Sequence, residues 1–194
     1  MAKILLLLAN GFEAVEASVF TDVLGWNKWE GDGSTEVVTA GIHPQIQCTW
    51  NFFVTPEQQL EELNLNDFDA LAIPGGFEEA GFYEDAFSEC FQKVIQHFDT
   101  HKKPIASICV ASLMIAHSGV LNNRKATTYN HPTSQRLVQL EQYGVQITKE
   151  RIVCDENIIT SSNPGTAFEV AFKLLEMLTS LDNTNKVKDL MGFK

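Results

Sequence analysis

Cys109 occupies the position where the residue types of this sequence best fit a nucleophile. An apolar segment, 104–108, ends at this cysteine, and a helical pattern begins directly after it. A residue in a one-residue turn between strand and helix needs small neighbours two positions away, and Ser107 and Ala111 are both small. A helix N-terminus beneath the sulfur favours the thiolate, which is the nucleophilic form. The pattern predicts a nucleophile elbow with Cys109 at positive φ; the alternative is an ordinary buried cysteine at a strand end.

Backbone N–H groups that could bind an oxyanion follow a second apolar segment, in the turn Pro74-Gly75-Gly76. Paired glycines let the backbone approach a ligand closely and can point N–H groups into a cleft. An N–H of Gly75 or Gly76, together with that of Val110, would form an oxyanion hole beside Cys109. The alternative is that Pro-Gly-Gly forms an ordinary turn.

Two carboxylates, Glu13 and Glu16, follow the first apolar segment at the start of a predicted helix. Acidic residues at this position often do no more than stabilise the helix dipole. A glutamate that faced Cys109 would act on the sulfur. As a protonated acid it could donate a hydrogen bond to the thiolate, and as a carboxylate it could serve as a base.

His131 is the only histidine predicted to lie at the carboxyl end of a strand, which makes it a candidate base. A lone histidine is more often a surface or capping residue. No spacing among the five histidines suggests a metal site, and none of the four cysteines forms a C-x-x-C pair. The sequence therefore predicts neither a metal nor a cofactor, and it predicts free thiols in a reducing compartment.

Strand signals alternate with helix signals along the chain, which is typical of a mostly parallel sheet with helices on both faces. Ligands of such α/β sandwiches bind outside the carboxyl ends of the strands, where all four candidate segments stand. We predict strands at 3–9, 35–40, 68–73, 104–109, 126–129, 145–147, 152–154 and 158–161, and a hairpin or edge pair within 46–54. We predict helices at 14–28, 56–63, 85–100, 110–117, 133–142 and 166–178, and a short one at 187–191 after a polar stretch, 182–185.

Length and charge exclude several classes of protein. A chain of 194 residues suits a single domain, 1–194, in which 183–194 is an extra helix or a tail. The formal net charge of −11, without a cluster of Lys and Arg, argues against nucleic acid and anionic membrane as partners. The apolar run 4–9 is too short for a membrane span or a signal peptide, so we expect a cytoplasmic protein.

Five segments in this order resemble the DJ-1/PfpI superfamily, most closely its DJ-1 (ThiJ) branch. The resemblance covers about nine-tenths of the chain. It implies a flavodoxin-like sandwich, a homodimer and a cofactor-free cysteine site built from Cys109, Glu16 and His131, with backbone donors at Gly75, Gly76 and Val110. The spacing from Gly11 favours Glu16 over Glu13. The segments are 8–16, 73–76, 108–109, 127–132 and 161–169.

The sequence also departs from related patterns. The PfpI-type peptidases carry a histidine directly after the cysteine, where this chain has Val110, which argues against peptidase activity. Class I glutaminases use a His-x-Glu sequence that is absent here. The DJ-1 branch often has an arginine near the position of Asn163, and residues 161–163 include none. The tail 183–194 matches no part of the family pattern.

The resemblance implies chemistry on small reactive aldehydes such as methylglyoxal, either as a glutathione-independent glyoxalase or as a related deglycase. The alternative is a redox sensor, stress-response or chaperone-like protein in which oxidation of Cys109 is the function. The apolar and aromatic residues Trp50, Phe52, Phe53 and Val54 suggest the dimer interface, although the same residues could fill the monomer core.

Overall fold

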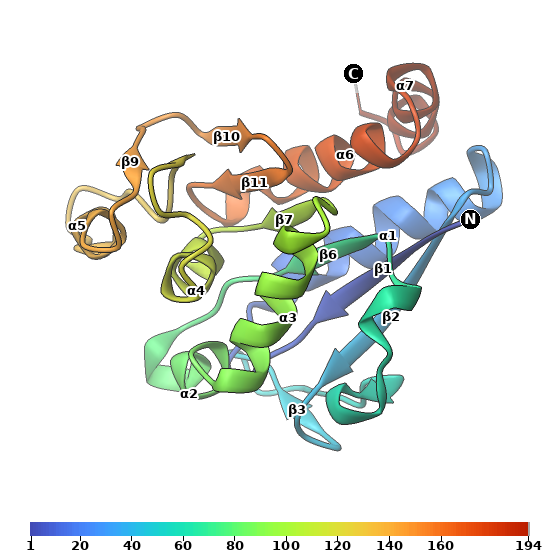
Figure 1. Cartoon of the computed structure of the whole chain (residues 1–194). Helices are drawn as coiled ribbons and strands as arrows, with labels where there is room; N and C mark the ends of the chain where they lie inside the picture. Colours follow the sequence, from blue (N-terminus) through green and yellow to red (C-terminus); the bar gives the residue numbers. More distant parts are fainter. Residues whose placement is uncertain (194) are drawn as a thin grey trace.

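The computed structural model describes residues 1–193, in which a twisted central sheet lies between helices (Figure 1). Within these residues the sheet has seven strands in the order β10-β11-β7-β6-β1-β2-β5. All of its pairings are parallel except that of β10 with β11, which is antiparallel. The strands are β1 (Ala2–Leu7), β2 (Thr35–Gly41), β5 (Gln58–Gln59), β6 (Ala70–Ile73), β7 (Ile105–Ser107), β10 (Ile152–Asp155) and β11 (Ile158–Ser161).

Helices cover both faces of this sheet, as the alternating pattern predicted. On one face α1, α6 and α7 contact one another, and on the other α2, α3 and α4 do so. Figure 1 shows α3 in front of the strands and α1 behind them. The predicted α/β sandwich with a mostly parallel sheet is therefore confirmed. The helices are α1 (Ala14–Glu30), α2 (Phe82–Ala86), α3 (Glu89–Thr100), α4 (Ala111–His117), α5 (Arg136–Glu141), α6 (Ala167–Leu178) and α7 (Leu181–Leu190).

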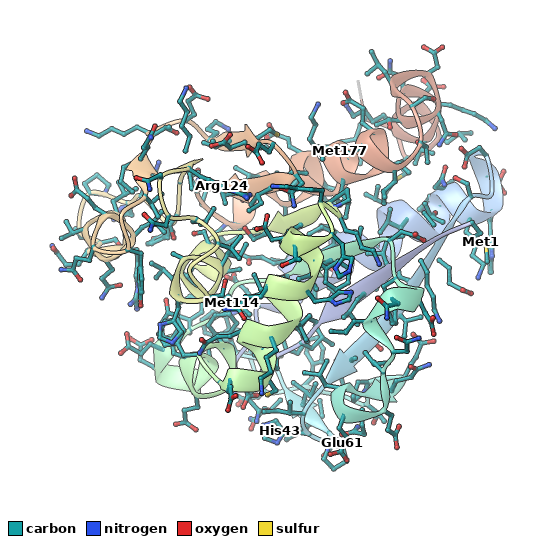
Figure 2. The ribbon with its side chains drawn as sticks, in the orientation of Figure 1. Met1, His43, Glu61, Met114, Arg124 and Met177 are labelled. Atoms are coloured by element: carbon teal, nitrogen blue, oxygen red, sulfur yellow. The ribbon has the colours of Figure 1, made fainter. Side chains whose placement is uncertain are left out.

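The burial of these elements follows their sequence patterns. In β1 the aliphatic side chains Ile4 to Leu7 are all buried, because helices cover the sheet on both sides. In α3 the buried residues Phe91, Val94, Ile95 and Phe98 recur every three or four positions and form one apolar face. Arg124, labelled in Figure 2, pairs with Asp99 of α3 at 2.9 Å and ties the segment after α4 to this helix.

Two pairs of short strands lie outside the central sheet. The predicted hairpin or edge pair is confirmed, because β3 (Ile46–Gln47) and β4 (Phe53–Val54) pair antiparallel. The predicted strand at 126–129 is shorter than expected. It forms only β8 (Lys125–Ala126), which pairs in parallel with β9 (Gln146–Ile147), and the residues after it continue as irregular chain.

Two helix predictions were wrong. The segment 56–63 forms the edge strand β5 and a single 3₁₀ turn, Leu60–Glu62, because the open edge of β2 offers hydrogen-bond partners to Gln58 and Gln59. The predicted helix 85–100 is divided into α2 and α3. The break falls at Ser88, whose side chain donates to the carbonyl of Asp85.

The segment predicted as a polar stretch and a short helix is one longer helix, α7. The side chain of Ser180 caps it by accepting from the N–H of Asn183 at 3.2 Å. Asn183 also donates to Asn27 of α1, and Thr184 and Val187 are buried. Of the two alternatives for the tail, the structure shows the docked helix; Lys194 lies outside the described residues.

No helix within residues 1–193 is long and apolar enough to cross a bilayer. In the same residues, His, Cys, Asp and Glu side chains do not gather in groups of three that could bind a metal ion.

Candidate active site

Cys109 lies in the sharp turn between β7 and α4, with a φ of 55°. The predicted elbow and its positive φ are thus confirmed. This conformation is strained for a residue with a side chain, and the surroundings hold it in place. The carbonyl of Cys109 accepts hydrogen bonds from the hydroxyls of Ser112 and Thr128, both at 3.2 Å. The sulfur therefore has a fixed position at the N-terminal end of α4.

Glu16, and not Glu13, is the carboxyl group buried beside this sulfur. Its side chain has no exposed surface, and its Oε2 accepts a hydrogen bond from the N–H of Gly75 at 2.6 Å. The other oxygen, Oε1, is buried and has no hydrogen-bond partner of its own within residues 1–193, and the side chain of Cys109 interacts with the carboxyl group. Because Oε2 is an acceptor, a proton on Glu16 belongs on Oε1, where it can be donated to the sulfur.

Gly75 has a different task from the one predicted. Its N–H binds Glu16 and so is not free to bind an oxyanion. The position needs a glycine, because a Cβ there would lie 2.9 Å from both Glu16 Oε2 and the carbonyl oxygen of Ile108. Gly75 therefore lets the turn after β6 approach the elbow closely and positions the carboxyl group.

Gly76 and Val110 remain as candidate donors of an oxyanion hole. The Val110 N–H already interacts with the sulfur of Cys109. In the part of the chain that is described, no acceptor takes the Gly76 N–H. A Cβ on Gly76 would lie 2.2 Å from the carbonyl oxygen of Gly11, so this backbone also approaches its neighbour too closely for any other residue.

The protonation states of Glu16 and Cys109 are linked. Burial raises the pKa of Glu16 to about 8, the negative charge of Glu13 adds to this effect, and hydrogen bonds from Gly75 and Cys109 oppose it. Burial also raises the pKa of the Cys109 thiol, and so would a charge on Glu16, whereas the Val110 N–H lowers it. The pKa of the Cys109 thiol is thus raised, whereas the helix N-terminus alone predicted a lowered pKa. At neutral pH the pair therefore carries at most one negative charge, and the proton on Glu16 removes the nearest charge that opposes a thiolate.

The Cys109 sulfur opens into a cavity of about 380 Å³, which is large enough for a small organic molecule. Glu13 lies in its wall, and burial raises the pKa of this carboxyl group too. The sequence analysis missed Tyr129 and Arg136 here, although Tyr129 lies in the strand-end segment 127–132 with His131 and Arg136 follows it. The lining residues are Glu13, Gly76, Phe77, Glu78, Glu79, Cys109, Val110, Tyr129, Thr133, Ser134, Arg136 and Pro164.

His131 is not brought to Cys109. It is exposed, its Nδ1 lies 2.8 Å from Thr133 Oγ1, and its ring stacks beside that of Tyr129 at 6.2 Å. The cavity wall is formed by Tyr129, Thr133 and Ser134 instead. The structure thus brings together Cys109, Glu16, Gly76 and Val110.

The raised pKa of Glu16 predicts a pH-dependent stability. The folded protein keeps a proton between about 4.5 and 8 that the unfolded chain has lost, so this contribution to stability is complete below 4.5 and is lost as the pH rises to 8. The free energy of unfolding should fall by about 1.4 kcal/mol per pH unit more in wild type than in Glu16→Gln. Urea unfolding at several pH values measures this difference.

The matched control for this experiment is Glu30→Gln, which removes an exposed carboxylate at the far end of α1. Its stability should change with pH in parallel with that of wild type. Parallel curves for wild type and Glu16→Gln would show that Glu16 is not protonated in the folded protein.

A flavodoxin-like α/β sandwich with a cysteine in a strand-to-helix elbow, faced by a buried glutamate, defines a class of cysteine-site proteins. The model of the DJ-1/PfpI family matches residues 2–177, so this chain belongs to that family. Protein DJ-1alpha of Drosophila melanogaster is 30% identical over 190 residues, which are 96% of this chain and 82% of that protein. The crystal structure of DJ-1beta from the same organism has a TM-score of 0.86 at 26% identity and covers 100% of this chain and 98% of its own.

Two further relatives carry names that state an activity. The deglycase PfpI of Pyrococcus furiosus is 26% identical over 178 residues, which are 91% of this chain and 99% of that protein. A glutathione-independent glyoxalase of Caenorhabditis elegans is 25% identical over 187 residues, which are 96% of this chain and 93% of that protein.

Proposed function

We propose that this protein converts small α-oxoaldehydes such as methylglyoxal into hydroxy acids, with Cys109 as nucleophile and without a cofactor. The observation that carries this proposal is the pairing of Cys109 with a buried, protonated Glu16 beside a cavity of about 380 Å³. The relatives named glyoxalase and deglycase support the same class of substrate. A deglycase reaction on glycated amines would begin with the same steps.

Because burial raises the pKa of the Cys109 thiol, the thiolate is the minor form at neutral pH, and it is this form, beside a protonated Glu16, that reacts. The sulfur adds to the aldehyde carbon, the N–H groups of Gly76 and Val110 stabilise the oxyanion, and Glu16 protonates it to form a hemithioacetal. The Glu16 carboxylate then removes the proton from the former aldehyde carbon, which gives an enediol, and returns it to the neighbouring carbon.

The result is a thioester of the hydroxy acid, which water hydrolyses to lactate and a free thiol. The aldehyde carbon is oxidised to the level of an acid while the ketone carbon is reduced to an alcohol. One water is consumed, and one proton is released with the lactate anion. The two redox changes compensate each other, so the reaction needs no external oxidant or reductant.

Incubation with methylglyoxal in the absence of glutathione tests the proposal, with lactate as the measured product. We expect many equivalents of lactate per protein. Consumption of a single equivalent of aldehyde without lactate would show that the protein only forms an adduct, which would refute the proposed function.

The second candidate function is that of a redox sensor, because the neighbours of the sulfur could stabilise its oxidised form. The sulfur is nearly buried, with 6% of Cys109 exposed, while a neighbouring carboxyl O–H and the Val110 N–H could hold the oxygens of a sulfinate. The lactate assay separates the two candidates, because a sensor has no turnover.

We also propose a homodimer that buries an aromatic patch, defined here as Trp50, Phe52, Phe53 and Phe77. The first three are more than half exposed, and Trp50 packs edge-on against Phe77 at 5.2 Å. The alternative that these residues fill the monomer core is wrong. Because Phe77 also lines the Cys109 cavity, the patch lies beside the candidate active site.

Light scattering at micromolar concentration should give the mass of two chains for wild type. The double variant Phe52→Asp, Phe53→Asp should give the mass of one chain. A buried charge opposite an apolar surface disfavours association strongly. Val138→Asp, a change at an exposed valine of α5, is the control and should remain dimeric. A monomeric wild type would contradict this proposal.

The free cysteines and the predicted reducing environment further lead us to propose a cytoplasmic location.

A further inference from the structure

An ion pair between Glu78 and Arg136 separates the Cys109 cavity from a second cavity. Arg136 Nη2 donates to Glu78 Oε2 at 2.8 Å and so joins the segment after β6 to the first turn of α5. Both side chains line the cavity beside Cys109, and both also line a second cavity of about 290 Å³. If the ion pair opened, the two cavities would form one continuous site.

The second cavity is suited to a polar group on a short chain. Tyr83 and Phe87 stack at 4.8 Å and form an aromatic wall, and Gln139 and Gln142 supply polar groups. The Tyr83 hydroxyl is buried and lacks a hydrogen-bond partner within residues 1–193. A buried hydroxyl without a partner is costly, and an acceptor on a ligand would remove that cost.

Arg136 and Glu78 differ in how easily each can leave the ion pair. The side chain of Glu78 is 62% exposed and that of Arg136 is 22% exposed, so Glu78 can turn into water at little cost. Arg136 is also held by Gln139 Oε1 at 2.9 Å and by the face of the Tyr83 ring at 5.1 Å. The guanidinium therefore stays in place and requires another anion when Glu78 departs.

We propose that Arg136 binds the anionic group of a substrate in exchange for Glu78, with the Tyr83 hydroxyl as a second donor. The substrate class is an α-oxoaldehyde that carries a carboxylate on a short chain. This inference rests on the proposed function and names the substrate class of that same site. The balance of the reaction is unchanged, because the remote carboxylate takes no part in the transfer of protons between the two oxygenated carbons.

Alkylation of Cys109 tests the anion site without any need for turnover. Each protein is treated with an N-alkylmaleimide and with its ω-carboxylated analogue of equal chain length, and mass spectrometry gives the rate at each cysteine. For each cysteine we compare the alkylation rate with the carboxylated maleimide to the rate with the neutral one. In wild type this ratio should be higher at Cys109 than at Cys90, which is exposed on α3 and serves as an internal reference.

Arg136→Gln should lower this ratio at Cys109 about tenfold, because a charge-assisted hydrogen bond is lost. Tyr83→Phe should lower it about threefold, because a neutral hydrogen bond is weaker. Glu78→Gln should raise it, because the competing carboxylate is gone. Lys28→Gln removes one positive charge at the last turn of α1 and should leave the ratio unchanged. An unchanged ratio at Cys109 in Arg136→Gln would overturn the proposal.

Initial rates with two aldehydes test the substrate class. The preference for 4,5-dioxopentanoate over methylglyoxal, expressed as the ratio of kcat/KM values, should fall about tenfold in Arg136→Gln. An unchanged preference would overturn the assignment of the substrate class. If wild type turned over neither aldehyde but kept the alkylation preference, the glyoxalase proposal would fail while the anion site would stand.

Discussion

Cys109→Ala is expected to abolish the formation of lactate from methylglyoxal, with a loss of at least about a thousandfold in kcat/KM. In the proposed mechanism the sulfur alone forms a bond to the aldehyde carbon, so without it the remaining binding and oxyanion groups would have no intermediate to stabilise. Alanine also fits the elbow sterically, because the change removes a single atom. The loss is therefore expected in a folded protein, which circular dichroism and urea unfolding verify.

The exposed cysteines provide matched controls for this variant. Cys90 lies at the start of α3, and Cys154 lies in β10; neither lines the cavity beside Cys109. Cys90→Ala and Cys154→Ala should keep the turnover of wild type. Lactate formation by Cys109→Ala at a rate near that of wild type would show that the chemistry takes place elsewhere, and it would also remove the basis of the proposed mechanism.

Glu16→Gln is expected to keep a reactive Cys109 but to lose turnover by about a hundredfold to ten-thousandfold, the range of general acid–base catalysis. The glutamine oxygen can still accept the Gly75 N–H, and its NH₂ group could donate to the sulfur as the proposal requires of the protonated carboxyl group. It cannot take a proton from the hemithioacetal and return it to the neighbouring carbon. Steady-state kinetics should therefore show a low kcat in a variant whose thiol still reacts.

Comparison of Glu16→Ala with Glu16→Gln separates the two proposed roles of Glu16, hydrogen-bond donor to the sulfur and base. This variant loses both functions, so its alkylation by a neutral maleimide at neutral pH should be slower than that of wild type and of Glu16→Gln. Glu13→Gln is the control, because Glu13 lies in the cavity wall and is only three residues away. Its turnover should fall by less than about tenfold. Unchanged alkylation–pH profiles in both Glu16 variants would show that Glu16 does not act on Cys109, and Glu13 would become the next candidate.

The sequence by itself determined the features that depend on a few neighbouring residues. The elbow at Cys109 was predictable because an apolar strand, small flanking residues and a helical pattern stand within eight positions of one another. The alternation of strands and helices and the doubly covered sheet were predictable for the same reason. Where a local pattern was weak, as at 56–63, the free edge of β2 decided the structure.

The tertiary structure decided which groups meet at the sulfur. The spacing from Gly11 favoured Glu16 over Glu13, but only the fold buries the Glu16 side chain against the N–H of Gly75, 59 positions away. The same contact takes the Gly75 N–H away from the predicted oxyanion hole. Burial in the packed fold raises the pKa values of Glu16 and Cys109, and for Cys109 it outweighs the effect of the helix N-terminus.

His131 and Arg136, which follow β8, also show that sequence position alone does not decide which side chain reaches the cavity. The position of His131 after a strand pointed to the site, yet its side chain pairs with Thr133 at the surface, whereas Arg136 lines the cavity and pairs with Glu78. Local sequence sets the backbone path, because φ and ψ preferences and hydrophobic periodicity act over a few residues. Hydrogen-bond partners, burial and charge come from segments that only the packed fold brings together, and these decide which of the candidate side chains can do chemistry.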